Sequence, residues 1–191
     1  EYLLTGELEK TNSAYAVAKI AGIELIKSYR KQYKRSWISL MPTNLYGPKD
    51  NFNVETGHVI PALINKFENA KRNNLKSVKL WGSGSALREF MYVDDLADAV
   101  LFCLDNYNED LHINVGTGEE ISIRNLAQLV SELVGFTGTV EWDTNQPDGT
   151  PRKVLDSTKL TQIGWKPKVT LSDGLTKTIG WYLSNYESAK R

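Results

Sequence analysis

The stretch SAYAVAKIAGIELIKSYRKQY, residues Ser13–Tyr33, predicts a long helix around which the rest of the chain is organised. Its first half is apolar nearly all round, which predicts burial on more than one side, while its second half is polar on its outer face. Tyr15 and Lys19 stand four residues apart and therefore share a face, one turn from each other. An ammonium group beside a phenol favours the phenolate, which suits the pair to proton transfer near neutral pH. Taken alone, the pair also fits a core tyrosine and a lysine that reaches solvent.

The composition narrows the classes of protein to which the chain can belong. Of its 191 residues, 41% are hydrophobic and 24% are charged, which is ordinary for a soluble globular protein. The 23 basic residues balance the 23 acidic ones, so no overall field attracts nucleic acid or an anionic membrane, although a local basic cluster for a small anion is compatible with this balance. Cys103 is the one cysteine, which excludes an internal disulfide. The sequence shows neither a signal peptide nor a membrane-spanning segment, and it predicts a cytoplasmic protein without a metal site.

The segments that follow the helix predict a buried strand and then a fixed loop. Residues 37–41, WISLM, form an apolar run typical of a parallel strand. Two prolines and a glycine fix the loop 42–48 at the carboxyl end of that strand, where ligands bind in open α/β sheets. His58 then begins a predicted helix that also carries Lys66. On sequence alone, His58 is either a cap or surface residue or a functional imidazole.

The second half of the chain continues the alternation of strands and helices. Residues 77–81 and 88–93 predict two strands, and the tight turn 82–86 is expected to join them as a hairpin. Asp94 and Asp95 begin the next helix, where carboxylates suit the helix dipole and a structural role is expected. The remaining predicted elements are helices at 122–134, 157–164 and 172–186 and strands at 111–115 and 139–143.

The order of the motifs resembles the extended short-chain dehydrogenase/reductases. Within that family, it is most similar to the enzymes that epimerise and reduce GDP-4-keto-6-deoxy-D-mannose to GDP-L-fucose. The resemblance covers essentially the whole chain. It is carried by YAVAK (15–19), MPTNLYGP (41–48), HVIPALI (58–64), WGSG (81–84), REFMYVDDLADA (88–99), INVGTG (113–118) and PDGTPRK (147–153).

The resemblance implies an α/β fold, in which the end of a Rossmann-like doubly wound parallel sheet is joined to a smaller α/β substrate-binding domain. Residues 1–50 would be the carboxyl-terminal part of the NADP-binding Rossmann domain. Residues 51–191 would mainly form the nucleotide-sugar domain, with 88–118 returning in part to the Rossmann sheet.

The resemblance also implies catalytic roles for three residues. Tyr15 would give a proton to the C4 oxygen as hydride reaches C4, and Lys19 would hold the nicotinamide ribose and tune Tyr15. His58 would exchange protons at the carbons made acidic by the C4 ketone. Binding of NADP(H) would involve Lys19, Pro42, Thr43, Asn44, Leu45 and His58. Binding of the GDP-sugar would involve Lys66, Trp81, Arg88, Asp148 and Lys153.

The sequence also departs from the family pattern. The family's amino-terminal part carries a Gly-rich turn for the cofactor, a catalytic Ser or Thr, and a cysteine that works with the histidine; none of these is in the sequence. The chain is therefore expected to be a carboxyl-terminal part that is inactive alone. Two alternatives stay open, namely another nucleotide-sugar epimerase or dehydratase of this superfamily and a non-catalytic nucleotide-sugar-binding protein. The resemblance further implies a homodimer through the helix Ser13–Tyr33.

Overall fold

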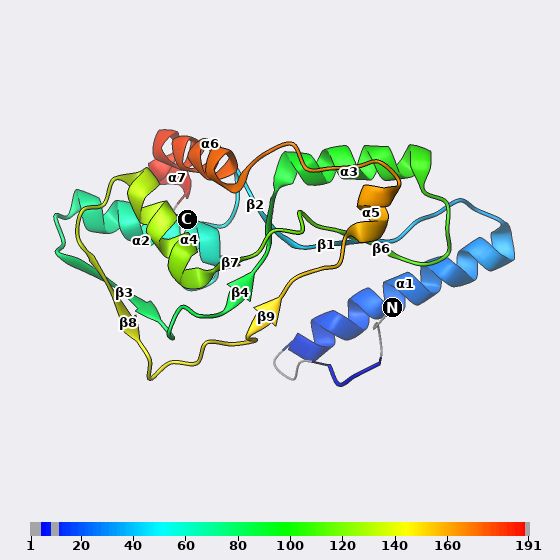
Figure 1. Cartoon of the computed structure of the whole chain (residues 1–191), viewed down its shortest axis with the longest axis horizontal. Coiled ribbons are helices and arrows are strands. Elements are labelled where there is room, and N and C mark those ends of the chain that lie inside the picture. The colour runs from blue at the N-terminus through cyan, green and yellow to red at the C-terminus, as the bar shows by residue number, and fades with distance from the viewer. Residues whose placement is uncertain (1–4, 9–11, 190–191) are drawn as a thin grey trace.

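The computed structural model describes residues 5–8 and 12–189, which form two lobes joined by a narrow middle (Figure 1). The helices are α1 (Ser13–Tyr33), α2 (Val59–Arg72), α3 (Val93–Asn106), α4 (Ile123–Val134), α5 (Thr158–Gln162), α6 (Leu171–Ser184) and α7 (Tyr186–Ala189). The strands are β1 (Leu40–Pro42), β2 (Asn44–Tyr46), β3 (Ser77–Trp81), β4 (Leu87–Arg88), β5 (Phe90–Tyr92), β6 (Ile113–Val115), β7 (Ile121–Ser122), β8 (Thr139–Asp143) and β9 (Arg152–Lys153). Among the described helices, none combines the length and apolarity needed to cross a membrane.

The first lobe is built on the parallel strand pair β1 and β6, with α3 and α1 on opposite sides of the pair in Figure 1. Helix α5 packs next to β6. Apolar side chains of β5, α3, β6 and α5 form one continuous core in this lobe. Its buried members are Met91, Ala99, Cys103, Tyr107, Ile113, Val115, Leu160 and Trp165.

The second lobe is built on the parallel pair β3 and β8. Helix α2 packs against β3, α4 packs against α2, and α6 packs against α4. The core of this lobe is larger, and three of its aromatic rings come from the loop before α2 and from α6. Phe52 is fully buried, with its ring centre 4.6 Å from that of Tyr182 and 5.8 Å from that of Trp181. The loop that precedes α2 is thereby fastened to α6.

The middle of the molecule contains two small sheets. Strand β2 pairs in parallel with β5. Strand β4 pairs antiparallel with β7 on one side and parallel with β9 on the other. These short strands hold the lobes together, and the register of β4 with β9 places Arg88 opposite Lys153.

The predicted hairpin between residues 77–81 and 88–93 is wrong. Strand β3 pairs with β8, and the segment after the turn splits into β4 and β5, which pair with other strands. Gly82 and Gly84 have positive φ angles of 76° and 74° and redirect the chain toward β4. A local turn pattern does not reveal a partner strand that lies about sixty residues further along the chain.

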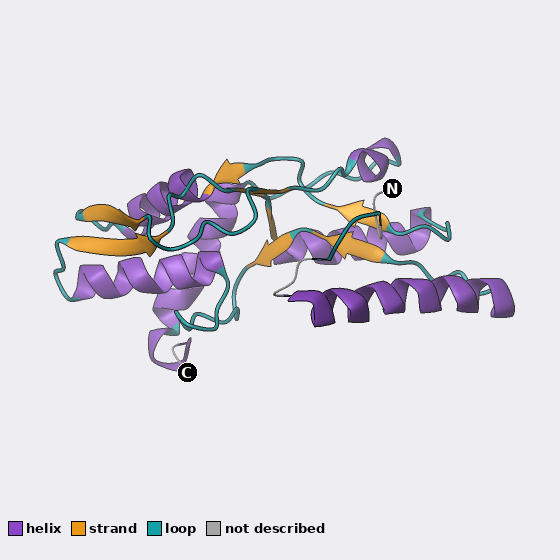
Figure 2. Cartoon of the chain, turned by 90° about the horizontal axis from the view of Figure 1, so that it is seen from below, coloured by secondary structure: helices purple, strands orange, loops and turns teal. Residues whose placement is uncertain are grey.

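The predicted burial of the long helix is also wrong for the described chain. Helix α1 spans Ser13–Tyr33 as predicted, but none of its residues is buried. Figure 2 shows it at the outer side of its lobe, with the strands on one flank only. Apolar side chains of this helix are therefore exposed, such as Val17 at 55% and Leu25 at 57%.

Gly116 follows β6 at a point where the backbone passes against a buried carboxylate. A Cβ atom there would overlap Oε1 of Glu89 and lie 2.7 Å from Oγ of Ser157. Gly116→Ala is therefore expected to lower the free energy of unfolding by about 1–3 kcal/mol, measured by urea denaturation. Gly180→Ala on α6 is the matched control, because nothing lies within 4 Å of its added Cβ. It is expected to raise the free energy of unfolding by about 0.5–1 kcal/mol, and equal effects of the two changes would contradict the prediction.

Candidate functional site

Helix α1 brings Tyr15 and Lys19 together at the surface. The Lys19 Nζ atom lies 5.3 Å from the centre of the Tyr15 ring, which is the contact expected one turn apart on a helix. Both side chains are exposed, Tyr15 to 60%. The pair is thus open to a ligand, with its phenol and its ammonium on the same face.

The predicted loop 42–48 is in part a strand, because β1 ends at Pro42 and β2 spans Asn44–Tyr46. The connection Pro42–Leu45 is fixed by hydrogen bonds rather than by its proline alone. The Thr43 backbone N–H donates to Val115 O at 2.9 Å. Thr43 Oγ1 and Asn44 Nδ2 both donate to the backbone O of Glu89, at 3.2 and 2.7 Å. Leu45 packs into the first lobe's core, while Pro42 is exposed. Of the predicted cofactor residues in this loop, Thr43 and Asn44 thus use their side chains to hold its shape.

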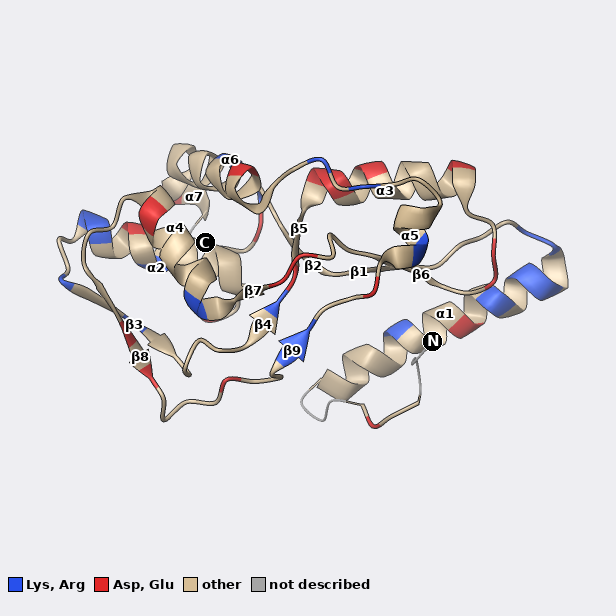
Figure 3. Cartoon of the chain, in the orientation of Figure 1, with Lys and Arg blue, Asp and Glu red and all other residues tan. Residues whose placement is uncertain are grey.

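Arg88 and Lys153 form a pair of cations on neighbouring strands. They are register partners in the parallel pair of β4 and β9, which Figure 3 shows as two basic strands side by side in the middle of the molecule. Arg88 is half-buried and Lys153 is exposed, and Arg88 Nη1 donates to the carbonyl of Leu87 at 2.8 Å. Two cations fixed by a strand ladder on an otherwise neutral chain suit an anion such as a diphosphate.

Asp148 binds the turn that follows Trp81, the last residue of β3. The Asp148 carboxylate accepts hydrogen bonds from the Ser83 backbone N–H at 2.6 Å and from Ser83 Oγ at 2.7 Å. These bonds lower the pKa of the Asp148 carboxyl. They also fasten the loop 145–151 beside Trp81, whose ring is 71% exposed. Ser83 was not predicted from the sequence, where it appears only as a turn residue.

His58 occupies the position before α2, and its side chain does not cap the helix in the described structure. The imidazole is exposed, as expected if His58 is a surface residue. An exposed position is also compatible with a functional imidazole. Lys66 lies two turns along α2 and is half-buried. Burial lowers the pKa of its ammonium group. Asn53 holds the preceding loop by accepting hydrogen bonds from the Glu55 and Thr56 backbone N–H groups at 2.8 and 3.1 Å.

Glu89 connects several of these groups and was not predicted from the sequence. It is fully buried between β4 and β5, and its carbonyl and carboxylate bind three different segments. The available signal was an acidic residue between the basic Arg88 and the apolar run FMYV, residues 90–93. An isolated carboxylate beside such a run has to be satisfied inside the fold.

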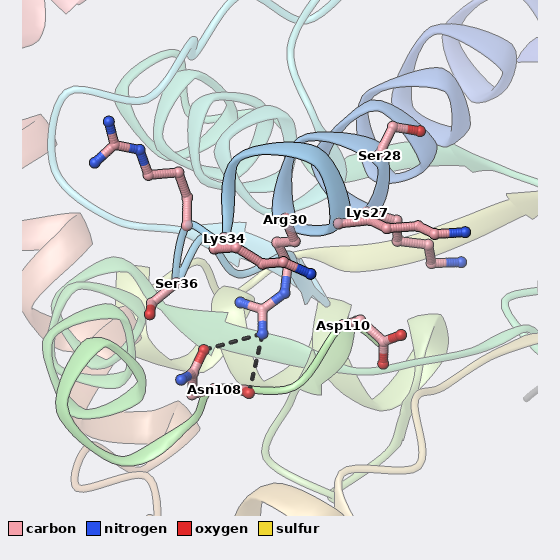
Figure 4. A pocket seen from close by; sticks show the side chains of 9 residues that line it. Lys27, Ser28, Arg30, Lys34, Ser36, Asn108 and Asp110 are labelled. Carbon is pink, nitrogen blue, oxygen red and sulfur yellow. Dashed lines mark hydrogen bonds between the residues drawn. The ribbon is translucent and has the colours of Figure 1, made fainter.

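A basic cavity of about 570 Å³ lies at the opposite end of α1 from Tyr15 (Figure 4). Arg30 closes one side of it, donating to Trp37 O at 2.5 Å and to O and Oδ1 of Asn108 at 3.0 Å each. Cations in this place suit the carboxyl end of a helix. The cavity contains none of the predicted site residues.

Comparison with known proteins identifies the family to which the chain belongs. The model of the NAD dependent epimerase/dehydratase family matches residues 1–116. The chain is 57% identical over 189 residues to "Probable GDP-L-fucose synthase 1" of Oryza sativa subsp. japonica, covering 99% of this chain and 58% of that protein. It is 48% identical over 194 residues to the GDP-L-fucose synthase of Escherichia coli K12, covering 97% of this chain and 60% of that protein.

Solved structures confirm the fold class predicted from the sequence. A GDP-L-fucose synthetase from Naegleria fowleri bound to NADP superposes with a TM-score of 0.92 at 33% identity, over 98% of this chain and 61% of that chain. A GDP-6-OMe-4-keto-L-xylo-heptose reductase from C. jejuni superposes with a TM-score of 0.88 at 33% identity, over 95% of this chain and 64% of that one. The chain thus spans about three fifths of the length of these relatives. It has the parallel α/β architecture of a Rossmann-like fold and belongs to the NAD dependent epimerase/dehydratase family.

Proposed function

We propose that the protein containing this chain converts GDP-4-keto-6-deoxy-D-mannose to GDP-L-fucose in the cytoplasm, by 3,5-epimerisation followed by NADPH-dependent reduction of the 4-keto group. The observation that carries the proposal is the Tyr15–Lys19 pair on α1, with the Lys19 Nζ atom 5.3 Å from the tyrosine ring. This pair occurs in a chain that is 57% identical to a probable GDP-L-fucose synthase. The pair supplies a proton donor for ketone reduction, and the cations Arg88 and Lys153 supply a site for a diphosphate.

The residues on α1 and after β1 fit the nicotinamide end of NADP(H). Lys19 presents an exposed ammonium group, and Pro42–Leu45 form the hydrogen-bonded connection from the end of β1 into β2. The cofactor, when bound, supplies a hydride to C4. Tyr15 donates its phenolic proton to the C4 oxygen, which becomes the hydroxyl of the product. Lys19 stabilises the phenolate that remains, because it lies on the same face of α1.

His58 serves the epimerisation in this proposal. The hydrogens at C3 and C5 are acidic because both carbons adjoin the C4 ketone. Inversion at such a carbon requires a base that removes its proton from one face and an acid that delivers a proton to the opposite face. An exposed imidazole can serve as one member of this acid–base pair near neutral pH. Phe52 is buried in the second lobe's core and anchors the loop before His58. The backbone that leads to His58 is therefore held in place.

The GDP-sugar would lie along the middle of the molecule, between the two lobes. Arg88 and Lys153 would neutralise the diphosphate, with Lys66 as a further cation. Trp81 would pack against the nucleotide, while Asp148 holds the adjoining loop through Ser83.

The proposal also divides the chain into domains. We assign residues 1–50 to the carboxyl-terminal part of the NADP-binding Rossmann domain. We assign 51–191 mainly to the substrate domain, with 88–118 shared with the Rossmann sheet.

A homodimer through α1 is the second part of the proposal. Val17, Ala21 and Leu25 recur every four residues on one face of the helix, and all three are exposed. Small and apolar side chains in this spacing allow close helix packing. A second copy of the same face would remove Val17 and Leu25 from water.

The two chemical steps are expected to separate by mutation in the full-length protein. Tyr15→Phe removes the proton donor and should lower the rate of ketone reduction by about 100-fold or more, while hydrogen exchange at C3 and C5 persists. His58→Asn should have the opposite effect, so that hydrogen exchange at C3 and C5 is slowed while ketone reduction persists. Reduction is measured by NADPH oxidation and exchange by proton NMR in D₂O.

The control for these variants is Tyr33→Phe, which alters an exposed tyrosine, 53% exposed, at the other end of α1 and should leave both rates unchanged. A Tyr15→Phe enzyme that reduces at the unmutated rate would contradict the assignment of the proton donor. An unmutated enzyme that reduces a GDP-4-keto sugar but shows no exchange would instead be a plain 4-reductase.

The dimer is tested by placing a charge on the proposed face of α1. Leu25→Glu is expected to convert the full-length dimer to a monomer at micromolar concentration, because two carboxylates would be buried against apolar surface. The mass is measured by light scattering after size-exclusion chromatography. Leu104→Glu on α3, where the leucine is 62% exposed, is the control and should remain a dimer. Dissociation by Leu104→Glu alone would place the interface on α3.

A further inference from the structure

Glu89 is held by donors from two segments that lie far from it in the sequence. Its Oε1 atom accepts from the Gly118 backbone N–H at 2.9 Å and from Thr117 Oγ1 at 3.4 Å. Its Oε2 atom accepts from the Leu155 backbone N–H at 2.9 Å. The side chain is fully buried, so these hydrogen bonds replace the water that an ionised carboxylate requires.

One of the two segments bound by the Glu89 carboxylate lies next to a residue of the proposed site. Leu155 stands two residues after Lys153, and Glu89 itself follows Arg88, the register partner of Lys153. The two-stranded contact of β4 with β9 is only two residues long on each side. A strand pair this short needs further stabilising contacts. The hydrogen bond from the Leu155 N–H group to Glu89, just beyond the paired residues, provides one.

The backbone of Glu89 reaches the other part of the site. Its carbonyl oxygen accepts from Thr43 Oγ1 at 3.2 Å and from Asn44 Nδ2 at 2.7 Å. Movement of Glu89 would therefore shift the connection after β1 together with the two cations. One buried residue is linked in this way to both that connection and the diphosphate cations.

We propose that Glu89 is a positioning residue, whose buried carboxylate fixes Lys153 beside Arg88 for the diphosphate and whose carbonyl fixes the connection Pro42–Leu45. This inference rests on the proposed function of the site. Glu89 does not touch the reacting atoms in this account. It acts through the backbone of residues 153–155 and through the side chains of Thr43 and Asn44.

The test is Glu89→Gln in the full-length protein, with GDP as the probe in calorimetric titration. Both carboxylate oxygens accept hydrogen bonds, whereas the glutamine amide has one acceptor oxygen and an NH₂ group that only donates. One of the segments held by Glu89 would then have its N–H donor facing the glutamine NH₂ group, which is also a donor, and that hydrogen bond would be lost. The Kd for GDP is expected to rise by roughly ten-fold or more, and KM for the GDP-sugar should change more than kcat.

Asp95→Asn is the matched control, because Asp95 is also buried and accepts from the backbone N–H groups of Lys168 and Val169, at 3.2 and 3.0 Å. It should lose a comparable amount of stability and bind GDP as the unmutated protein does. Glu89→Asp keeps both acceptors on a shorter side chain and should give a Kd between those of the unmutated protein and Glu89→Gln. It also carries the test if Glu89→Gln does not fold.

A double variant tests whether Glu89 acts through Lys153. If it does, Glu89→Gln combined with Lys153→Ala should bind GDP no more weakly than Lys153→Ala alone, whereas a fully additive loss would overturn this route. Unmutated affinity in both Glu89→Gln and Glu89→Asp would overturn the inference while leaving the proposed function intact. Failure of the unmutated protein to bind GDP would instead overturn the proposed function itself.

Discussion

The parallel pair of β2 and β5 divides the interior into two cores, and the arrangement of both lobes depends on it. Successive side chains of a strand point to opposite faces, so a strand of three residues can serve both sides. In β5, Phe90 and Tyr92 belong to the core of the second lobe, while Met91 belongs to the core of the first. In β2, Tyr46 and Leu45 divide in the same way. A shift of either strand by one residue would exchange these faces and expose or overfill both cores.

The candidate site is placed by this dividing pair. Asn44 begins β2 and Glu89 directly precedes β5, so the amino ends of the two strands meet where β1 ends. The short strands β4 and β9 extend from the same place and carry Arg88 and Lys153. Polar and charged groups thus gather where the apolar division ends, and there the buried carboxylate of Glu89 accepts hydrogen bonds from the backbone N–H groups of Gly118 and Leu155.

Helix α1 differs from the other long helices in having no buried residue. Helices α2 and α4, by contrast, bury one continuous face each in the second lobe. The exposed apolar face of α1 includes Val17 and Leu25, which are 55% and 57% exposed. The same exposure leaves Tyr15 and Lys19 open, and their contact within one helical turn does not require any neighbour.

The sequence by itself determined the features that arise within one segment. Helix α1, the Tyr15–Lys19 contact, the helix starting after His58 and the capping of α4 by Ser122 follow from helical spacing and local hydrogen bonds. Only the tertiary structure decided the pairing of β3 with β8, the register of Arg88 with Lys153 and the burial of Glu89. These features depend on contacts between segments that are distant in the chain, and such contacts leave no local periodicity in the sequence.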